Sequence, residues 1–230
     1  MKILWIWSRR ALLALILVFV AYQLWFFGHI VYWRFANPVE TRFMEIRLEE
    51  LRERDPGARL KHQWVPYARI SLHLKRAVVA AEDDKFVDHE GFDWEGIQKA
   101  LEKNQRKGRI VAGGSTISQQ LAKNLFLSPA KTPWRKAQEG LITLMLETML
   151  DKRRILEIYL NVVEWGNGVF GAEAAARRYY GMSAAQLGPE QAARLAVMLP
   201  NPRKYERNYS PRLAAHAARI QARMVGSEVP

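Results

Sequence analysis

The 230-residue sequence contains no cysteine, so no disulfide framework holds the fold and no thiolate is available to ligate a metal. It also lacks the G-x-x-x-x-G-K-[ST] order of a phosphate-binding P-loop. Acidic residues are outnumbered, with 23 Asp and Glu against 35 Lys and Arg, which gives a formal net charge of +12. Charge of this sign implies an anionic partner, which can be nucleic acid, an anionic bilayer surface or a phosphorylated substrate.

One long hydrophobic run is present, from Ala11 to Ile30. Its length of about 20 residues is enough to cross a bilayer core as a helix. Lys2, Arg9 and Arg10 precede it, so the positive-inside rule places the N-terminus in the cytoplasm and the chain after about residue 34 outside. A cleaved signal peptide is the alternative, but the run is long for one and no A-x-A-like cleavage site follows. We therefore predict an uncleaved anchor. The aromatic residues expected at the far membrane interface are Trp25, Phe26, Phe27 and Trp33.

The rest of the chain is punctuated by helix signals rather than alternating strand patterns, which predicts a mainly α fold. We expect residues 1–34 to form the cytoplasmic N-terminus and anchor, residues 35–70 a membrane-proximal connector, and residues 71–230 the functional domain. Helices are expected over residues 39–54, 72–82, from a cap at 93, from 116 to before 128, and over 132–150, 154–163, 172–180 and 186–198.

Two glutamates are candidates for glycosyl chemistry, which typically needs two acid/base or charge-stabilising groups on opposite sides of an anomeric carbon. Glu82 ends an apolar helix, where partial burial would raise its pKa and favour work as a general base. A solvated acid at a helix end is the alternative. Glu139 lies one turn after Arg135 and Lys136, so it is either a second functional carboxylate or a partner in a helical ion pair.

The segment from Gly113 to Asn124 lies between these glutamates and places hydroxyl groups at a predicted helix N-terminus. Thr116 and Gln119 have the spacing of a capping box, so an anion-binding cradle and an ordinary capped helix are equally good interpretations. Nearby, His89 has no second His or Cys at ligand spacing, and Phe86 is an aromatic residue within an acidic segment. A hydrogen-bonding histidine and a packing phenylalanine are the favoured interpretations.

Taken in order, these segments closely resemble the peptidoglycan glycosyltransferase family. The first motif comprises Glu82, Asp83, Phe86, His89 and Gly91, the second Gly114, Ser115, Thr116, Gln119, Gln120, Lys123 and Asn124, and the third Arg135, Lys136 and Glu139. Two further matches run from Lys152 to Gly181 and from Leu199 to Pro202. The chain departs from the family pattern at two positions. Met182 stands where the family often has a basic residue, and Lys131 stands where an arginine is common. They leave both glutamates in place.

The resemblance implies a lysozyme-like helical glycosyltransferase domain with a small membrane-proximal lobe, behind an N-terminal transmembrane helix. It also implies polymerisation of lipid II into glycan strands by inverting transfer, with release of undecaprenyl diphosphate. The chain is similar to single-function members, because 230 residues leave no room for an attached transpeptidase. The implied location is the bacterial inner membrane, single-pass, with the catalytic domain in the periplasm. The implied partners are lipid II, the growing glycan chain, the membrane, and cell-division or cell-wall synthesis proteins.

By resemblance, Glu82 is the base that deprotonates the acceptor hydroxyl, and Glu139 assists on the donor side. Lys123 and Lys131 or Arg135 would neutralise the leaving diphosphate. No cofactor is required, although Mg²⁺ or Mn²⁺ near Glu139 is compatible with the chemistry. The implied substrate-binding residues are Asp83, Phe86, His89, Gly114, Ser115, Thr116, Gln119, Gln120, Lys123, Asn124, Lys131, Arg135 and Lys136.

Three other functions fit parts of the pattern. A lytic transglycosylase or muramidase would cleave the same glycan with one acid, but the second acidic site and the basic residues suited to a lipid phosphate speak against it. A catalytically silent scaffold would not need both glutamates. Nucleic-acid binding is permitted by the charge, but an exported domain rarely meets DNA, so no nucleic-acid partner is expected.

Overall fold

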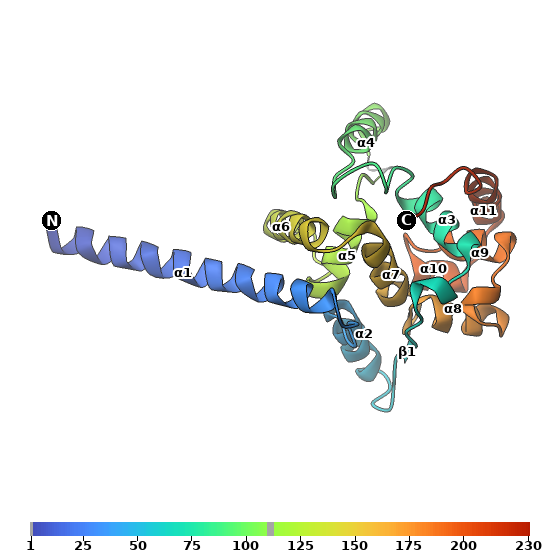
Figure 1. Ribbon diagram of the computed structural model, residues 1–230, viewed down its shortest axis with the longest axis horizontal. Coiled ribbons are helices and arrows are strands. Elements are labelled where there is room, and N and C mark those ends of the chain that lie inside the picture. Colours follow the sequence, from blue (N-terminus) through green and yellow to red (C-terminus); the bar gives the residue numbers. More distant parts are fainter. Residues whose placement is uncertain (1, 110–112) are drawn as a thin grey trace.

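The computed structural model describes residues 2–109 and 113–230 and is mainly helical, which confirms the predicted fold class. Its helices are α1 (Lys2–Trp33), α2 (Arg42–Arg52), α3 (Leu72–Glu82), α4 (Trp94–Lys107), α5 (Ile117–Phe126), α6 (Pro133–Met149), α7 (Lys152–Val162), α8 (Ala172–Tyr180), α9 (Pro189–Ala196), α10 (Pro202–Arg207) and α11 (Pro211–Arg223) (Figure 1). Single 3₁₀ turns cover Tyr67–Arg69 and Ala184–Gln186. The short strands are β1 (Lys61–His62), β2 (Glu164–Gly166) and β3 (Val169–Phe170).

Helix α1 projects from the body as a long rod (Figure 1). Its stretch Trp5–Trp33 contains an 18-residue window with a mean hydropathy of 2.2 and is long enough to cross a membrane. Most of it is exposed, as a lipid-facing helix would be, but Phe26, Ile30 and Trp33 are buried against the body. Phe26 and Trp33 each pack on Phe126 of α5 with ring centroids 5.0 Å apart. These two aromatic residues therefore contact protein, which differs from the lipid-interface position expected of them.

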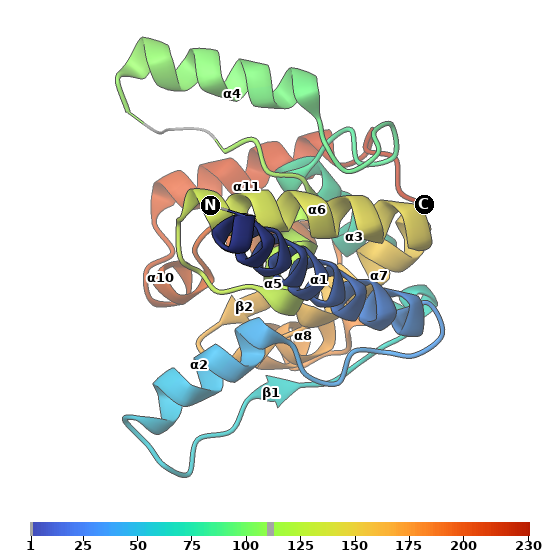
Figure 2. The same ribbon diagram turned by 90° about the vertical axis from the view of Figure 1, so that its left-hand side faces the viewer.

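Polar contacts also attach α1 to the body. The side-chain amides of Gln23 and Gln138 on α6 exchange two hydrogen bonds, of 3.0 and 2.9 Å. Arg154 on α7 donates to the carbonyl of Trp33 at 3.0 Å and to that of Ala36 at 2.6 Å. It thus satisfies a carbonyl that the end of a helix leaves without an internal partner. Figure 2 shows α6 running beside α1.

The core of the body is built on α3, α5, α7 and α9, which contribute many of its fully buried side chains. Helix α5 packs against α6 and α7, while α3 packs against α9 and α11. Side chains of α5 such as Leu121 and of α7 such as Tyr159 have no exposed surface. This arrangement brings the C-terminal end of α3 next to the N-terminus of α5, where the motif residues lie.

A small sheet ties the predicted connector to the body. Strand β1 pairs in parallel with β3, with Lys61 opposite Val169, and β3 pairs antiparallel with β2. Gly171 follows β3 at φ +83°, and a Cβ there would lie 2.6 Å from the carbonyl oxygen of Asn161. Only glycine fits such a position, so this turn into α8 is fixed by sequence.

Several predicted boundaries hold and others do not. Helices α3 and α8 have the predicted ends, and α5 begins after the predicted cap at Thr116. The predicted helix over 186–198 was too long, because Gly188 separates the turn at Ala184–Gln186 from α9. Helices α10 and α11 were not predicted. Pro202 and Pro211 stand in their first turns, where proline is tolerated.

Candidate active site

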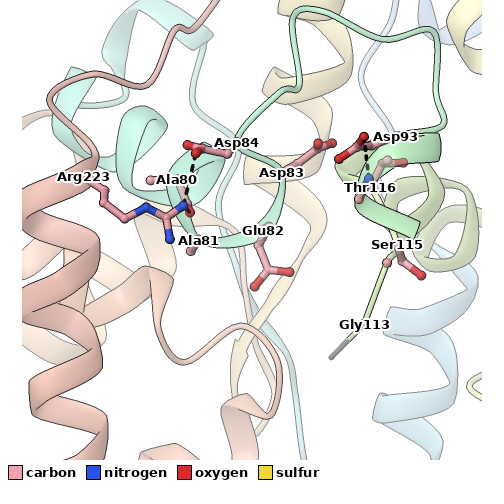
Figure 3. A pocket seen from close by; sticks show the side chains of 12 residues that line it. Ala80, Ala81, Glu82, Asp83, Asp84, Asp93, Gly113, Ser115, Thr116 and Arg223 are labelled. Carbon is pink, nitrogen blue, oxygen red and sulfur yellow. Dashed lines mark hydrogen bonds and ion pairs between the residues drawn. The ribbon is translucent and has the colours of Figure 1, made fainter. Parts of the chain in front are cut away.

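Three consecutive acidic residues at the end of α3 organise the site. Figure 3 shows Glu82 pointing away from Asp83 and Asp84, Asp83 directed toward the segment that carries Thr116, and Asp84 directed toward Arg223. Each side chain therefore has different surroundings although the three are adjacent in sequence.

Glu82 is half-buried and lines a cavity of about 180 Å³. Its carboxylate accepts a hydrogen bond of 2.7 Å from Nε2 of Gln120. Burial raises the pKa of Glu82 above its ordinary value, and the nearby charge of Asp83 adds to this, although Gln120 and Lys123 act in the opposite direction. A carboxylate with a raised pKa is a stronger base once ionised, which suits proton abstraction.

Gln120 is itself held in one orientation. The hydroxyl of Tyr159 donates to its Oε1 at 2.9 Å, which leaves the Nε2 group to face Glu82. Burial raises the pKa of Tyr159 well above its ordinary value, so this hydroxyl stays a donor. A buried tyrosine from the fourth matched motif thus fixes the direction of the hydrogen bond on Glu82.

Asp83 and His89 join the end of α3 to the start of α5. Asp83 is buried, and its Oδ2 accepts from the backbone N–H of Ile117 in the first turn of α5 at 2.9 Å, a position that favours a negative charge. Its Oδ1 accepts from His89 Nε2 at 2.9 Å, while the N–H of Gly91 donates to His89 Nδ1 at 3.1 Å. These contacts support the interpretation of His89 as a structural residue.

The segment before α5 is a capped helix that borders the cavity. The predicted capping box of Thr116 and Gln119 is confirmed. The Thr116 hydroxyl also donates to the carbonyl of Gly91 at 2.7 Å, and Ser118 donates to Glu147. Ser115 alone of the three predicted hydroxyl residues is exposed, so the cradle offers a ligand fewer hydroxyls than the sequence suggested. The cavity is lined on this side by Gly113, Gly114, Ser115 and Thr116.

Glu139 is buried on α6 and paired with two cations. Arg135 and Lys136 both contact its carboxylate, so the predicted helical ion pair is present. Lys136 also lies 3.3 Å from the hydroxyl of Ser115, which connects this cluster to the rim of the Glu82 cavity. The Nε atom of Arg135 is buried without a hydrogen-bond partner among the described residues.

Lys123 stands between the two glutamates. Burial lowers the pKa of its ammonium group, whereas Glu139 and Glu82 both favour its charged form. Together with Gln120 and Asn124 it lines a second cavity, of about 280 Å³, which also contains Arg47. The structure therefore brings Glu82, Gln120, Lys123 and Glu139 into one connected site.

The remaining predicted residues lie elsewhere. Phe86 is fully buried in the core with the ammonium of Lys152 4.7 Å from its ring, and neither Phe86 nor His89 lines either cavity. Gln119 is buried by its capping role. Lys131 is exposed before α6, and among the described residues it makes no hydrogen bond or ion pair.

Some residues of the site were not picked out as functional from the sequence. Tyr159 belongs to a matched motif but had no assigned role, and its orienting of Gln120 depends on a contact across 39 positions. Arg223 lines the Glu82 cavity from α11, a helix that was not predicted. The charge pattern of α11 gave no signal that one of its arginines faces Asp84.

The surroundings of Glu139 are occupied by cationic side chains of the chain itself. The residues that the structure describes contain no group of three or more His, Cys, Asp or Glu side chains that could share a metal. Glu139, near which Mg²⁺ or Mn²⁺ was considered compatible with the chemistry, is paired with Arg135 and Lys136.

The body is helical and follows an apolar helix that is long enough to cross a membrane, with one carboxylate of raised pKa in a cavity and a second among cations. These features are consistent with the class of membrane-anchored glycan-processing enzymes. Comparison with known proteins specifies the class. Residues 48–225 match the transglycosylase family model, more than half of the chain, and the protein belongs to this family. The helical body is consistent with the lysozyme-like fold that the resemblance implied.

Curated relatives match along essentially the whole chain. A protein of Azoarcus sp. (strain BH72) is 68% identical over 230 residues, covering 100% of both chains. One from Dechloromonas aromatica (strain RCB) is 67% identical over 100% of both chains, and one from Aromatoleum aromaticum is 67% identical over 97% of each. All three are named biosynthetic peptidoglycan transglycosylase.

Proposed function

We propose that this protein polymerises lipid II into glycan strands and releases undecaprenyl diphosphate. As a member of the transglycosylase family with relatives of this name, it is a peptidoglycan glycosyltransferase of cell-wall synthesis. The observation that carries the finer proposal is the environment of Glu82, a carboxylate of raised pKa that opens on a cavity beside a cluster of cations.

Glu82 acts as the general base. The ionised carboxylate takes the proton from the acceptor sugar hydroxyl, and the hydroxyl oxygen then forms a bond to the anomeric carbon of the donor. The bond from that carbon to the diphosphate oxygen breaks on the opposite face, so the configuration inverts. The hydrogen bond from Gln120 holds one oxygen of Glu82, which leaves the other oxygen to meet the hydroxyl.

The cations near Glu139 stabilise the leaving diphosphate. Lys123 carries positive charge beside the second cavity, and Arg135 carries it in the third motif. Glu139 orients Arg135 and Lys136 through its ion pairs. Lys131 lies exposed just before α6 and adds charge at the site's margin. This chain's own residues supply the charge stabilisation, so no step is assigned to a metal.

The membrane arrangement follows from α1. We assign residues 1–34 to the cytoplasmic N-terminus and anchor, 35–70 to the membrane-proximal connector and 71–230 to the glycosyltransferase domain, which lies on the periplasmic side of the inner membrane. The basic residues before the apolar run and the single candidate span among the described residues support this orientation. Confinement to the bilayer brings the site to a lipid-linked substrate and to other cell-wall synthesis proteins.

The test is product analysis with the purified, detergent-solubilised chain. We expect labelled lipid II to be converted into polymer, separated from substrate by size. Cleavage of preformed glycan without polymer would favour the lytic enzyme instead. If neither polymer nor cleavage products form, the result would favour a catalytically silent scaffold.

A further inference from the structure

Arg223 at the end of α11 holds the last turn of α3. Its guanidinium donates to the carbonyl of Ala80 at 2.8 Å and lies 3.3 Å from Oδ2 of Asp84. Ala80 and Asp84 flank Glu82, two residues before it and two residues after it. Because Arg223 also lines the Glu82 cavity, this contact reaches the candidate base from the side opposite to the segment of Thr116 (Figure 3).

The residues after α11 add to this attachment, and we call residues 224–230 the C-terminal strap. Ser227 is buried and its hydroxyl donates to Oδ1 of Asp84 at 3.0 Å. Further along, the hydroxyl of Tyr67 donates to the carbonyl of Pro230 at 2.5 Å. Met224, also buried, begins the strap at the core. Most of the strap lies beyond residues 48–225, which match the family model.

We propose, on the basis of the proposed function, that Arg223 and Ser227 are positioning residues that fix the last turn of α3 and so the place of Glu82. The last carbonyls of a helix have no internal partners, so an unsupported final turn frays. Here Arg223 binds one of those carbonyls, that of Ala80. Arg223 and Ser227 both contact the carboxylate of Asp84. Asp83 anchors the turn on the inner side and the strap anchors it on the outer side.

The attachment controls geometry more than stability. The Arg223–Asp84 pair is 56% exposed on both sides, and ion pairs of this kind contribute little to folding. A catalytic group, by contrast, loses about 100-fold in rate when it is displaced by about 1 Å. Loss of the attachment would therefore lower turnover while the fold persists.

The experiment compares Arg223→Met, Ser227→Ala and Asp84→Asn with wild type in the full-length, detergent-solubilised chain. Arg219→Met is the matched control, because Arg219 is an exposed arginine one turn earlier on α11. We expect Arg223→Met to lower kcat for lipid II about tenfold with KM within about twofold, and Arg223→Lys to recover part of the loss. The control should leave both parameters unchanged.

Two further readouts separate positioning from general destabilisation. A frayed turn hydrates Glu82, which faces Gln120, Lys123 and Asp83, so the rising limb of the kcat profile should move to lower pH in Arg223→Met. Amide hydrogen exchange over residues 79–83 should become faster in this variant and stay unchanged in the control.

Wild-type kcat in Arg223→Met, or an equal loss in Arg219→Met, would overturn the positioning role. In the same assay, polymer formed by the wild type would support the proposed function whatever the result for Arg223→Met. If wild type forms no polymer, the proposed function fails, and hydrogen exchange still decides whether the strap holds α3. Unchanged exchange in Arg223→Met would then overturn the inference as well.

Discussion

Glu82, Asp83 and Asp84 carry the same functional group and differ only in what surrounds them. Glu82 faces a cavity and accepts one hydrogen bond, Asp83 is buried and accepts two, and Asp84 is held by α11 and the strap. Burial raises the pKa of Glu82, and a single hydrogen-bond donor, Gln120, acts against this rise. Glu82 is therefore the candidate base, and Asp83 and Asp84 fix the end of α3 through contacts with different elements.

The raised pKa of Glu82 predicts the pH dependence of the enzyme. The base works only when ionised, so kcat should rise with pH through a midpoint above the ordinary glutamate value of 4.5. The free energy of unfolding should change in the opposite direction, because burial favours the protonated form of Glu82. The stability that this protonated form contributes is lost as pH rises through the raised pKa. Initial rates of lipid II polymerisation across the acidic range measure this, and a midpoint at or below 4.5 would contradict it.

Asp83 is predicted to be a stability residue. Asp83→Ala leaves the N–H of Ile117 and the ring of His89 without their partner inside the body, so we expect a loss of about 1–3 kcal/mol in the free energy of unfolding. Denaturant unfolding in detergent measures it. Asp88→Ala, which changes an exposed acid five residues further along the chain, is the control, and equal stability of the two variants would refute the assignment.

Helix ends that depend on neighbouring residues were predicted correctly, whereas elements that depend on contacts between distant parts of the chain were not. The end of α3 at Glu82 and the capping box of α5 follow from neighbouring residues, so the sequence located them. The strands span only two or three residues each and depend on pairing between β1 and β3, far apart in the chain. Helix α11 was missed although Ser210 caps it and Leu213, Ala217 and Ile220 share its buried face.

The same division applies to the site. Family motifs placed Glu82, Gln120, Lys123 and Glu139 in order, and the structure brings them together. The partners that set their properties come from distant elements, such as Tyr159 on Gln120. Such contacts have no signature in a single sequence, because they depend on how α3, α5, α7 and α11 pack.

The attachment of α1 to α6 is predicted to depend on the paired amides of Gln23 and Gln138. Removing one amide leaves the other without its partner in an apolar setting, so Gln23→Leu should lower stability in detergent by about 1 kcal/mol. The double variant with Gln138→Leu should lose less than the sum of the single losses. Thermal unfolding measures both, with Leu24→Ala at an exposed position as the control, and additive losses would contradict the pairing.

The whole molecule joins an apolar anchor to a basic body. The net charge of +12 agrees with the proposed diphosphate substrate and with the proposed position beside an anionic membrane. The last turns of α1 are packed on α5 and α6, so the anchor also sets where the site lies relative to the membrane-spanning segment. Glu139 stands directly after Gln138 on α6, which places the anchor's polar contact beside the second glutamate.

The most direct test of Glu82 as the base of polymerisation compares Glu82→Gln with wild type on labelled lipid II. The change is nearly isosteric, so it removes the base while the fold and lipid binding persist. We expect polymer from wild type and a rate at least about 100-fold lower from Glu82→Gln, with no loss of thermal stability because a buried charge is removed. Polymer formed by Glu82→Gln at the wild-type rate would contradict the assignment.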